Sequence, residues 1–433
     1  MERTFLEKVT TRSLRVGIIG LGYVGLPLAV TFAEAGFHVT GIDTDQQKVD
    51  QASRGESYIP DVSSSALQRL IDTKYICFTS DYSALDDIDA VSICVPTPLR
   101  KTRDPDISYI ISATQQVRDH LHPGELVILE STTYPGTTDE VLLSELESTG
   151  LKVGLDFFLA FSPERIDPGN LDFSARTTPK IVGGITPTCT KLAQAFYGAA
   201  IEKVVTVSSA RVAEMAKLLE NTFRAVNIGL VNEIAIICEK LSIDVWEVID
   251  AAATKPFGFM RFLPGPGLGG HCIPVDPHYL SWKLKTLDYT ARFIELAAEV
   301  NSSMPRYVVN KIGEALNEQR LSFNGATVLV LGAAYKRNVG DVRESPALDV
   351  LQELIARKAV VLYNDEYVSS LVLGNQTLFS QPLRNELLQA ADCVVIVTDH
   401  SYYDVPWIIR EARCIVDTRN MTQGYKDQKI FRL

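Results

Sequence analysis

The sequence has 433 residues, of which 46% are hydrophobic and 22% charged, and a formal net charge of −11. This length suits two or three domains, and the composition is that of a globular chain with ample core material. The acidic balance argues against a general nucleic-acid-binding protein. Seven scattered cysteines without CxxC spacing predict a reducing, cytoplasmic setting and no disulfide framework. No run of eighteen apolar residues occurs, so we expect no membrane span.

The first chemical motif is a strand, a glycine turn, a helix and a second strand that ends in an acid. Residues 15–19 predict the first strand, Gly20-Leu21-Gly22-Tyr23-Val24-Gly25 follows it, and a helix at 26–35 and a strand at 37–42 precede Asp43. The glycines permit a tight turn and close approach to a pyrophosphate at the helix N-terminus. A carboxylate at Asp43 would accept from both ribose hydroxyls and repel a 2′-phosphate, which favours NAD over NADP. A purely structural glycine turn is the alternative.

Further strands are predicted at 75–79, 90–95 and 126–130, and the last two end in notable loops. These loops carry Thr97 and Thr132, whose hydroxyls can bond ribose, nicotinamide or a catalytic water at the carboxyl ends of the strands. Ordinary turn chemistry is the alternative for both. The apolar run 158–161 leads to Glu164, which is either a base or water-positioning group in a cleft or an exposed loop carboxylate.

A long helix is predicted from Ala210 to about Leu241, because this stretch lacks proline and its apolar residues recur at helical spacing. About thirty residues give a helix of about 45 Å, long enough to bridge two domains or to form a subunit interface. Lys217 and Asn221 share one face of it. An ammonium and a carboxamide so placed can hold a developing oxyanion, although a solvated surface pair is the alternative. Further helices are predicted at 242–253 and 293–316.

The stretch from Pro264 to Pro277 is too rich in glycine and proline for a helix interior or a central strand. It predicts a restricted loop that presents Cys272. This cysteine is either a nucleophile, if positive charge or amide dipoles favour its thiolate, or a buried structural thiol. His271, Cys272, Asp276 and His278 crowd into eight residues without a distant ligand pair, so no metal site is predicted.

The C-terminal part repeats the strand–turn–helix pattern without the three-glycine fingerprint. Residues 326–331 predict a strand, a helix follows at 346–356, and strands are predicted at 360–363, 393–398 and 414–417. Lys336 and Arg343 could supply charge for a phosphate, or this half could be structural. The residues therefore predict an α/β fold with two Rossmann-like ends and a helical middle region.

Five motifs follow one another along the chain. They are Gly20–Gly25, Phe161-Ser162-Pro163-Glu164-Arg165, Lys217-x-x-x-Asn221, Gly269-Gly270-His271-Cys272 with Asp276, and Gly332-x-x-Tyr335-Lys336 with Arg343-Glu344-Ser345-Pro346. With these motifs in this order, the chain resembles the UDP-glucose/GDP-mannose dehydrogenases, the family of nucleotide-sugar 6-dehydrogenases, over nearly its whole length. The resemblance implies an NAD-dependent, four-electron oxidation of the C6 hydroxyl of a UDP-sugar to a carboxylate by a homodimer.

The resemblance implies an α/β fold of two Rossmann-like doubly wound domains joined by a long central helix and a helical middle region. The implied domains are 1–205 for NAD, 206–315 for the helical dimerisation region with the cysteine loop, and 316–433 for the nucleotide sugar.

The resemblance also implies roles for individual residues. Cys272 would form a thiohemiacetal and then a thioester, while Lys217 and Asn221 would hold the C6 oxygen. Asp276 would support Lys217 and the cysteine region, and Glu164 would act as a base or orient water near Thr132. Implied cofactor contacts are Gly20, Gly22, Tyr23, Val24, Gly25, Asp43, Thr97 and Thr132, and implied substrate contacts are Glu164, Arg165, Lys217, Asn221, Gly269, Lys336 and Arg343.

The sugar is predicted from the cysteine segment. UDP-glucose enzymes usually carry Cys-x-x-Lys-Asp, whereas Val275 precedes Asp276 here. The stretch 264–280 is more similar to the UDP-N-acetylglucosamine 6-dehydrogenase branch, although that branch commonly has an aromatic residue where His278 stands. UDP-N-acetylglucosamine is therefore the predicted substrate, with UDP-glucose and UDP-N-acetylmannosamine as alternatives.

Two other classes compete with this interpretation. A two-electron β-hydroxyacid dehydrogenase shares the first domain and the helical lysine and asparagine, but it needs neither Cys272 nor a second Rossmann-like end. A nucleotide-sugar-binding relative without activity would be expected to lose Cys272, Lys217 or the glycine fingerprint, and all three are present.

Overall fold

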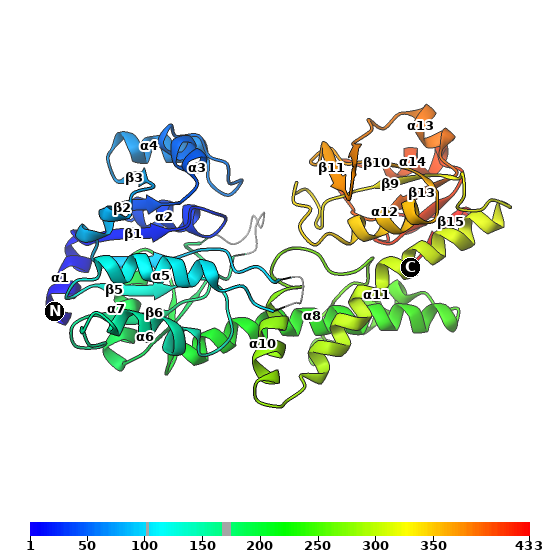
Figure 1. Cartoon of the computed structure of the whole chain (residues 1–433). Coiled ribbons are helices and arrows are strands. Elements are labelled where there is room, and N and C mark those ends of the chain that lie inside the picture. The colour runs from blue at the N-terminus through cyan, green and yellow to red at the C-terminus, as the bar shows by residue number, and fades with distance from the viewer. Residues whose placement is uncertain (101–103, 167–174) are drawn as a thin grey trace. The chain divides into compact units, whose positions relative to one another are not determined.

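The structure, a computed structural model, describes residues 1–100, 104–166 and 175–433. It divides into two compact units. The first unit contains residues 1–220 and 278–289, and the second contains residues 221–277 and 290–433. Helix α8, Ala210–Lys240, is a single element that contributes to both units (Figure 1).

The first unit is built on an eight-stranded sheet in the order β3-β2-β1-β4-β5-β6-β7-β8. All neighbouring strands are parallel except β6 and β7, which are antiparallel. The strand order reverses beside β1, and such switch points are where parallel α/β sheets bind ligands. The strands are β1 Arg15–Ile19, β2 His38–Ile42, β3 Ile76–Thr79, β4 Ala90–Ile93, β5 Leu126–Leu129, β6 Phe158–Phe161, β7 Lys180–Gly184 and β8 Val204–Thr206.

Helices cover both faces of this sheet. Alternate residues of β5 belong to different cores: Leu126 and Ile128 pack with α2 and α7, whereas Val127 and Leu129 pack with α5 and α6. With both faces buried, the carboxyl ends of the strands are left for ligands. The helices are α1 Glu2–Thr11, α2 Gly25–Glu34, α3 Gln46–Ser53, α4 Ser64–Asp72, α5 Ser108–His120, α6 Leu143–Glu147 and α7 Pro187–Gly198, with a 3₁₀ helix, η1 Tyr82–Asp87, and a π-helical segment, η2 Thr138–Leu142.

The second unit contains a five-stranded parallel sheet in the order β10-β9-β13-β14-β15 and a separate hairpin, β11–β12. Residues of β9 also alternate between two cores, with Val328 and Val330 in one and Leu329 and Leu331 in the other. The strands are β9 Thr327–Leu331, β10 Val360–Asn364, β11 Ser370–Leu373, β12 Gln376–Phe379, β13 Cys393–Ile396, β14 Ile415–Asp417 and β15 Ile430–Arg432. The remaining helices are α9 Val245–Ala253, α10 Asp276–Lys285, α11 Arg292–Glu318, α12 Pro346–Ala356, α13 Asn385–Ala390 and α14 Val405–Glu411.

The predicted fold class is confirmed, since parallel sheets with flanking helices occur at both ends of the chain and a long helix lies between them. Two local predictions need correction. The helix predicted from residue 242 begins at Val245, because Ser242 has a left-handed φ of 55° and the Asp244 side chain caps the helix by accepting from Trp246 N at 2.8 Å. The predicted cysteine loop ends earlier than expected, at Asp276, where α10 begins with a proline in its first turn.

Helix α11 continues through Pro305, which lies inside it and is fully buried. Proline donates no backbone hydrogen bond, so the carbonyl of Asn301 loses its usual helical donor. Gly267 of the cysteine loop lies at this point: a Cβ on Gly267 would come within 3.2 Å of Asn301 O. The loop therefore packs where the helical ladder is interrupted.

Candidate active site

The glycine turn between β1 and α2 has the close packing that a dinucleotide-binding turn requires. Gly20 has φ +91°, and a Cβ there would lie 2.5 Å from Cys94 O. A Cβ on Gly25 would overlap the carbonyl oxygen of Gly20. Around Gly22, by contrast, the described residues other than its two chain neighbours place no atom within 4 Å of a built Cβ. Two glycines are thus needed by the turn itself, and the third leaves open space beside it, which fits a bound pyrophosphate.

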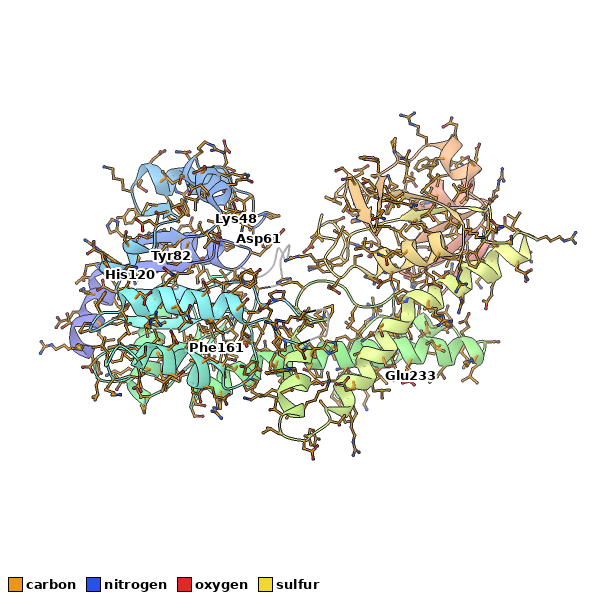
Figure 2. All side chains as sticks on the ribbon, in the orientation of Figure 1. Lys48, Asp61, Tyr82, His120, Phe161 and Glu233 are labelled. Carbon is orange, nitrogen blue, oxygen red and sulfur yellow. The ribbon has the colours of Figure 1, made fainter. Side chains whose placement is uncertain are left out.

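Asp43 follows β2 and is fixed at the edge of this turn. Its Oδ2 accepts from Leu21 N at 2.8 Å, and its Oδ1 accepts from Asp45 N at 2.9 Å. The ammonium of Lys48, labelled in Figure 2, lies 3.6 Å from Oδ2. Asp43 is 7% exposed. A carboxylate held in this orientation is suited to accept from a ribose.

The other residues predicted to contact the cofactor follow the carboxyl ends of β1, β4 and β5. Tyr23 and Val24 form the tip of the turn, and Tyr23 is 38% exposed. Thr97 follows β4, and its carbonyl accepts from the Tyr279 hydroxyl. Thr132 follows β5 and is half-buried. All of these residues belong to the first unit.

Glu164, just after β6, belongs to a buried charge network. Its Oε1 accepts from the backbone amides of Arg165 at 2.6 Å and Ile166 at 2.7 Å. Its Oε2 lies 3.1 Å from Lys180 Nζ, which also binds Glu130 Oε2 at 2.5 Å. The side chains of Glu164, Glu130 and Lys180 are each at most 14% exposed.

The network lowers the pKa of one of its two carboxyl groups and raises that of the other. Burial alone would raise the pKa of Glu164, but the Lys180 ammonium and the two amides outweigh burial and hold that pKa below its ordinary value. Burial raises the pKa of Glu130, which Lys180 and a hydrogen bond from the Tyr197 hydroxyl only partly offset. Burial would lower the pKa of Lys180, but the two carboxylates raise it. Glu164 is therefore ionised near neutral pH.

Arg165 makes structural contacts in the same region. Its Nε and Nη2 lie 3.2 and 2.6 Å from the carboxylate of Glu220 on α8, and its Nη1 donates to Pro179 O at 2.7 Å. A bidentate pair of this kind is geometrically specific. Arg165 therefore ties the Glu164 loop to the long helix.

Lys217 and Asn221 lie one turn apart on α8 and are 8% and 4% exposed. Neither is the solvated surface residue that was the alternative. Asn221 Nδ2 donates to Asp276 Oδ2 at 2.5 Å, and Asp276 is also buried. The first residue of α10 thus orients the Asn221 carboxamide.

The segment that carries Cys272 is attached to the second sheet domain. Gly270 N donates to Arg343 O at 3.0 Å. A Cβ on Gly269 would lie 2.5 Å from Tyr335 Cβ, and one on Gly270, whose φ is +85°, would lie 3.0 Å from the Tyr335 ring. Both glycines are therefore required by the contact with Tyr335.

Cys272 itself is half-buried, and its Sγ lies 3.4 Å from the nearer ring nitrogen of His271. Its carbonyl accepts from the amides of Val275 at 3.1 Å and Asp276 at 2.8 Å, which closes a turn immediately before α10. An imidazole beside a thiol can stabilise the thiolate. All seven cysteines carry thiols.

Lys336 and Arg343 lie in the long connection from β9 to α12. Lys336 is half-buried, and Arg343 forms a bidentate pair with Asp341, with Nη2 2.6 Å from Oδ2. Among the residues that the structure describes, no three His, Cys, Asp or Glu side chains are placed to hold a metal ion. Within the same described ranges, no helix has both the length and the apolar character to cross a bilayer.

Sequence reasoning missed Lys180, Glu130 and Tyr335. A lysine that opens the buried strand 180–184 was an available signal, because an ammonium there needs an anionic partner. Glu130 was included in a predicted strand but received no role. Tyr335 was only part of a motif, and its contact with Gly269 and Gly270, 66 and 65 residues earlier in the chain, required the fold.

A dinucleotide turn in one Rossmann-like sheet and a cysteine segment attached to a second one define a class, the NAD-dependent oxidoreductases with a separate substrate domain. Three family models match the chain in order. They describe the NAD binding domain (residues 14–201), the central domain (211–303) and the UDP binding domain (329–424) of the UDP-glucose/GDP-mannose dehydrogenase family. The chain belongs to this family.

Individual relatives agree with that assignment. The chain is 36% identical to the UDP-N-acetyl-D-glucosamine 6-dehydrogenase of Pseudomonas aeruginosa, covering 83% of this chain and 84% of that protein. It is 33% identical to the UDP-N-acetyl-D-mannosamine dehydrogenase of Pyrococcus horikoshii, covering 97% and 98%. A solved structure of the UDP-D-ManNAc dehydrogenase of P. horikoshii has a TM-score of 0.88 and 33% identity, covering 97% and 98% of the two chains. The chain is thus an NAD-dependent nucleotide-sugar dehydrogenase, and its cofactor prediction is confirmed.

Proposed function

We propose that the enzyme oxidises the C6 hydroxyl of UDP-N-acetylglucosamine to the carboxylate, with UDP-N-acetylmannosamine and UDP-glucose as the alternatives. The observation that carries this proposal is the attachment of the Cys272 segment to the UDP-binding domain through Gly270 and Arg343. A thiol held against the domain that binds the UDP group can meet a carbon of the attached sugar. A two-electron alcohol dehydrogenase would have no use for it.

The proposed chemistry balances around Cys272. Oxidation of the alcohol gives an aldehyde, and the Cys272 thiolate adds to its carbon to form a thiohemiacetal. A second oxidation gives a thioester, and water attacks the acyl carbon, releasing the carboxylate and restoring the thiol. One alcohol, one water and two NAD⁺ thereby give one carboxylate, two NADH and three protons. NAD, when bound, accepts the hydride that leaves C6 in each oxidation.

Lys217 and Asn221 would hold the C6 oxygen in both halves of the reaction. Negative charge develops on that oxygen when the alcohol is deprotonated and again when the thioester is attacked. A buried ammonium stabilises this charge strongly because little water competes with it. Asp276 positions the carboxamide through the 2.5 Å bond to Asn221, and we propose that it also supports the cysteine segment.

Glu164 would act on the hydrolytic water, with Thr132 near that water. Its lowered pKa makes it a weak base that is ionised at neutral pH, which suits orienting the water and accepting its proton as the tetrahedral intermediate forms. Further substrate contacts are proposed for Arg165, Gly269, Lys336 and Arg343, with Lys336 and Arg343 facing the diphosphate as cations.

Replacing Lys180 tests the role of Glu164 through pH. In Lys180→Met the ammonium is gone, so burial raises the pKa of Glu164. The acidic limb of the kcat–pH profile, where activity rises as Glu164 ionises, should then move to higher pH. Lys180→Arg keeps the positive charge and should leave the limb near its wild-type position. An unmoved limb in Lys180→Met would remove Glu164 from the hydrolytic step.

The cofactor site is proposed to be formed by Gly20, Gly22, Tyr23, Val24 and Gly25, whose amides face the pyrophosphate. Asp43 would accept from the adenosine ribose, and Thr97 and Thr132 would lie near the nicotinamide half. The open space at Gly22 and the fixed carboxylate of Asp43 support this assignment.

Two alanine substitutions distinguish a glycine that the turn requires for its own packing from a glycine that leaves space for NAD. Gly25→Ala places a Cβ against the Gly20 carbonyl, so both the melting temperature and NAD binding should fall. Gly22→Ala meets no protein atom, so the melting temperature should be kept, while the methyl group occupies cofactor space and raises the Kd for NAD by about tenfold or more. Thermal unfolding and calorimetric titration with NAD measure both effects. Unchanged NAD affinity in Gly22→Ala would place the pyrophosphate elsewhere.

We propose that the functional domains are residues 1–205, 206–315 and 316–433, with NAD on the first and the UDP-sugar on the last. We further propose a homodimer, and we place the enzyme in the cytoplasm because its seven cysteines form no disulfide. The dimer proposal is supported by an apolar stripe along one face of α8 that is 38–60% exposed. The stripe consists of Val212, Met215, Leu219, Phe223, Leu230 and Ile237.

A charge within the stripe should break the dimer. The residues of the stripe repeat so that all lie within a narrow arc of the helix, and a second copy of the same face is complementary to it. Leu230→Glu should convert the enzyme to monomers in light scattering at micromolar concentration. Arg224→Glu, an exposed substitution on the other side of α8, should remain dimeric. A dimeric Leu230→Glu would exclude this stripe as the interface.

The choice of sugar is tested by initial rates of NADH formation. UDP-N-acetylglucosamine, UDP-N-acetylmannosamine, UDP-N-acetylgalactosamine, UDP-glucose and GDP-mannose are compared at equal concentration. The highest kcat/KM should belong to UDP-N-acetylglucosamine. A higher value for another UDP-sugar would replace this assignment and leave the chemistry intact. Absence of NADH with every sugar would contradict the proposed function itself.

A further inference from the structure

The second sheet repeats the strand-end geometry of the dinucleotide site in detail. Gly332, after β9, has φ +85° and donates to Asn364 O at 2.9 Å, as Gly20 with φ +91° donates to Ile42 O at 2.7 Å. The next residue after each second strand is an aspartate, Asp365 in place of Asp43.

The hydrogen bonds of the two aspartates also correspond. Asp365 Oδ2 accepts from Ala333 N at 2.8 Å, as Asp43 Oδ2 accepts from Leu21 N at 2.8 Å. Asp365 Oδ1 accepts from Tyr367 N at 2.9 Å, which matches the 2.9 Å bond from the amide two residues after Asp43. Asp365 therefore stands where a dinucleotide-binding domain places its ribose-binding carboxylate.

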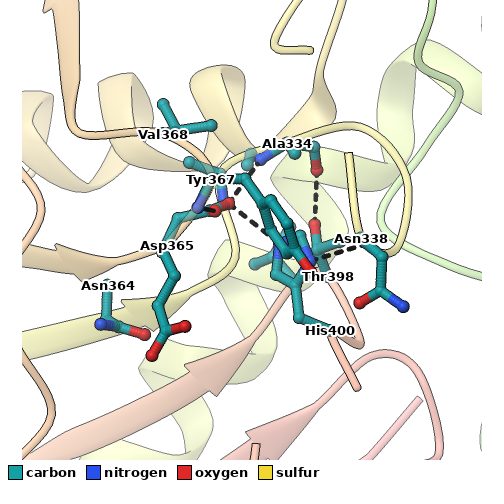
Figure 3. Close-up of polar contacts among 12 residues, drawn as sticks. Ala334, Asn338, Asn364, Asp365, Tyr367, Val368, Thr398 and His400 are labelled. Carbon is teal, nitrogen blue, oxygen red and sulfur yellow. Dashed lines mark hydrogen bonds and ion pairs between the residues drawn. The ribbon is translucent and has the colours of Figure 1, made fainter. Parts of the chain in front are cut away.

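In the second domain an imidazole of the chain occupies the position facing this carboxylate. His400 Nε2 lies 2.9 Å from Asp365 Oδ2, and Asn338 N donates to His400 Nδ1 at 2.9 Å (Figure 3). Because Nδ1 accepts, Nε2 carries the hydrogen and donates it to Asp365. His400 is 0% exposed and Asp365 is 1% exposed.

The same pair fixes the connection that follows β9. Asp365 Oδ2 also accepts from Ala334 N at 3.0 Å, and His400 holds Asn338, which has a left-handed φ of 59°. Asn338 Oδ1 in turn accepts from the amide and hydroxyl of Ser401 at 2.9 and 3.0 Å. The His400–Asp365 pair therefore holds residues 333–338 at both ends. The amides of Ala333 and Ala334 donate to Asp365, and the amide of Asn338 donates to His400.

We propose that His400 fills the ribose position of a former dinucleotide site and serves as a positioning residue for the UDP-sugar, by fixing the loop 333–338. This loop carries Lys336 and Tyr335. Tyr335 is the residue on which Gly269 and Gly270 pack, so the pair also supports the segment of Cys272. The proposal rests on the proposed function, because it assigns the loop to the substrate of that reaction.

His400→Phe tests the proposal with little change in packing. The phenyl ring keeps the stack on Tyr402, where the His400 and Tyr402 rings lie 5.3 Å apart with 12° between their planes, but it removes both hydrogen bonds. The KM for the UDP-sugar should rise about tenfold, as expected for loss of a buried, charge-assisted bond. The KM for NAD should stay within about twofold. The amides of Ala333, Ala334 and Asn338 should exchange hydrogen faster.

Two further variants distinguish positioning from general destabilisation. His400→Gln offers a carboxamide that can donate to Asp365 and accept from Asn338, and it should recover most of the lost affinity. Leu388→Ala creates a cavity in the core of this domain that does not contain Ala333 and Ala334, and it should lower the melting temperature without changing the KM for the UDP-sugar.

Three results would overturn the proposal: an unchanged KM in His400→Phe, an equal rise in Leu388→Ala, or wild-type exchange rates for the loop amides in His400→Phe. The exchange measurement needs no substrate. It therefore tests the loop even if no UDP-sugar is oxidised by the wild-type enzyme, an outcome that would contradict the proposed function separately.

Discussion

Replacing Cys272 with serine should lower kcat by about 10⁴-fold or more, because removal of the nucleophile of a covalent mechanism can cost about 10⁶-fold in kcat. A serine hydroxyl is nearly isosteric with the thiol but ionises far less readily, so it is a much weaker nucleophile even beside the His271 imidazole. The thiohemiacetal would not form, and the second oxidation would lose its substrate. Binding of the UDP-sugar should stay within about threefold of wild type, because the hydroxyl fits where the thiol stood.

The control for this variant is Cys77→Ser, which changes an exposed thiol on β3 and should leave kcat unchanged. Steady-state kinetics and calorimetric titration with the UDP-sugar measure the two effects separately. A Cys272→Ser enzyme that keeps wild-type kcat would refute covalent catalysis by this thiol. A variant that fails to bind the sugar would show that Cys272 acts in binding instead.

Replacing Lys217 with methionine should have the second largest effect, a fall in kcat of about 10²- to 10³-fold. Methionine retains most of the apolar stem and can fill the same buried space on α8. The ammonium that is proposed to stabilise the C6 oxygen is then missing while the alcohol is deprotonated. The KM for the UDP-sugar should change by less than about threefold, because the charge develops mainly in the transition state.

Lys240→Met is the matched control, since it removes an exposed lysine from the C-terminal end of the same helix. Its kcat should equal that of wild type. The account of Lys217 fails if Lys217→Met keeps kcat within threefold, or if only KM rises, which would indicate a ground-state contact.

The successful sequence predictions rest on local patterns of residues. The turn from Gly20 to Gly25 and the following Asp43 lie within one strand–helix–strand unit, so residue spacing alone determines their relative positions. Helix α12 was predicted with its observed bounds, because Pro346 starts it and the apolar period is regular.

The antiparallel strand β7 and the networks around it were not predicted. Lys180 meets Glu130 across 50 residues of sequence, and His400 meets Asp365 across 35. Such pairs depend on strand order and register, which no local pattern encodes. No role was predicted for Asp365 from the sequence, because its partner His400 lies 35 residues further along the chain.

The relation between Cys272 and its surroundings was predicted in part. The glycines before it correctly indicated a close backbone approach, but the sequence did not identify the group that the backbone approaches. The fold identifies Tyr335 as that partner and shows that Asp276 opens α10. Packing against Tyr335 therefore explains why Gly269 and Gly270 precede Cys272.

The central claim is a four-electron oxidation through Cys272, and the most direct test is the amount of NADH formed per mole of limiting UDP-sugar. The enzyme is incubated with excess NAD until the absorbance of NADH stops rising. The account predicts two NADH per sugar, with the uronic acid as the product. One NADH per sugar, with release of the aldehyde, would contradict it and leave Cys272 without the role proposed here.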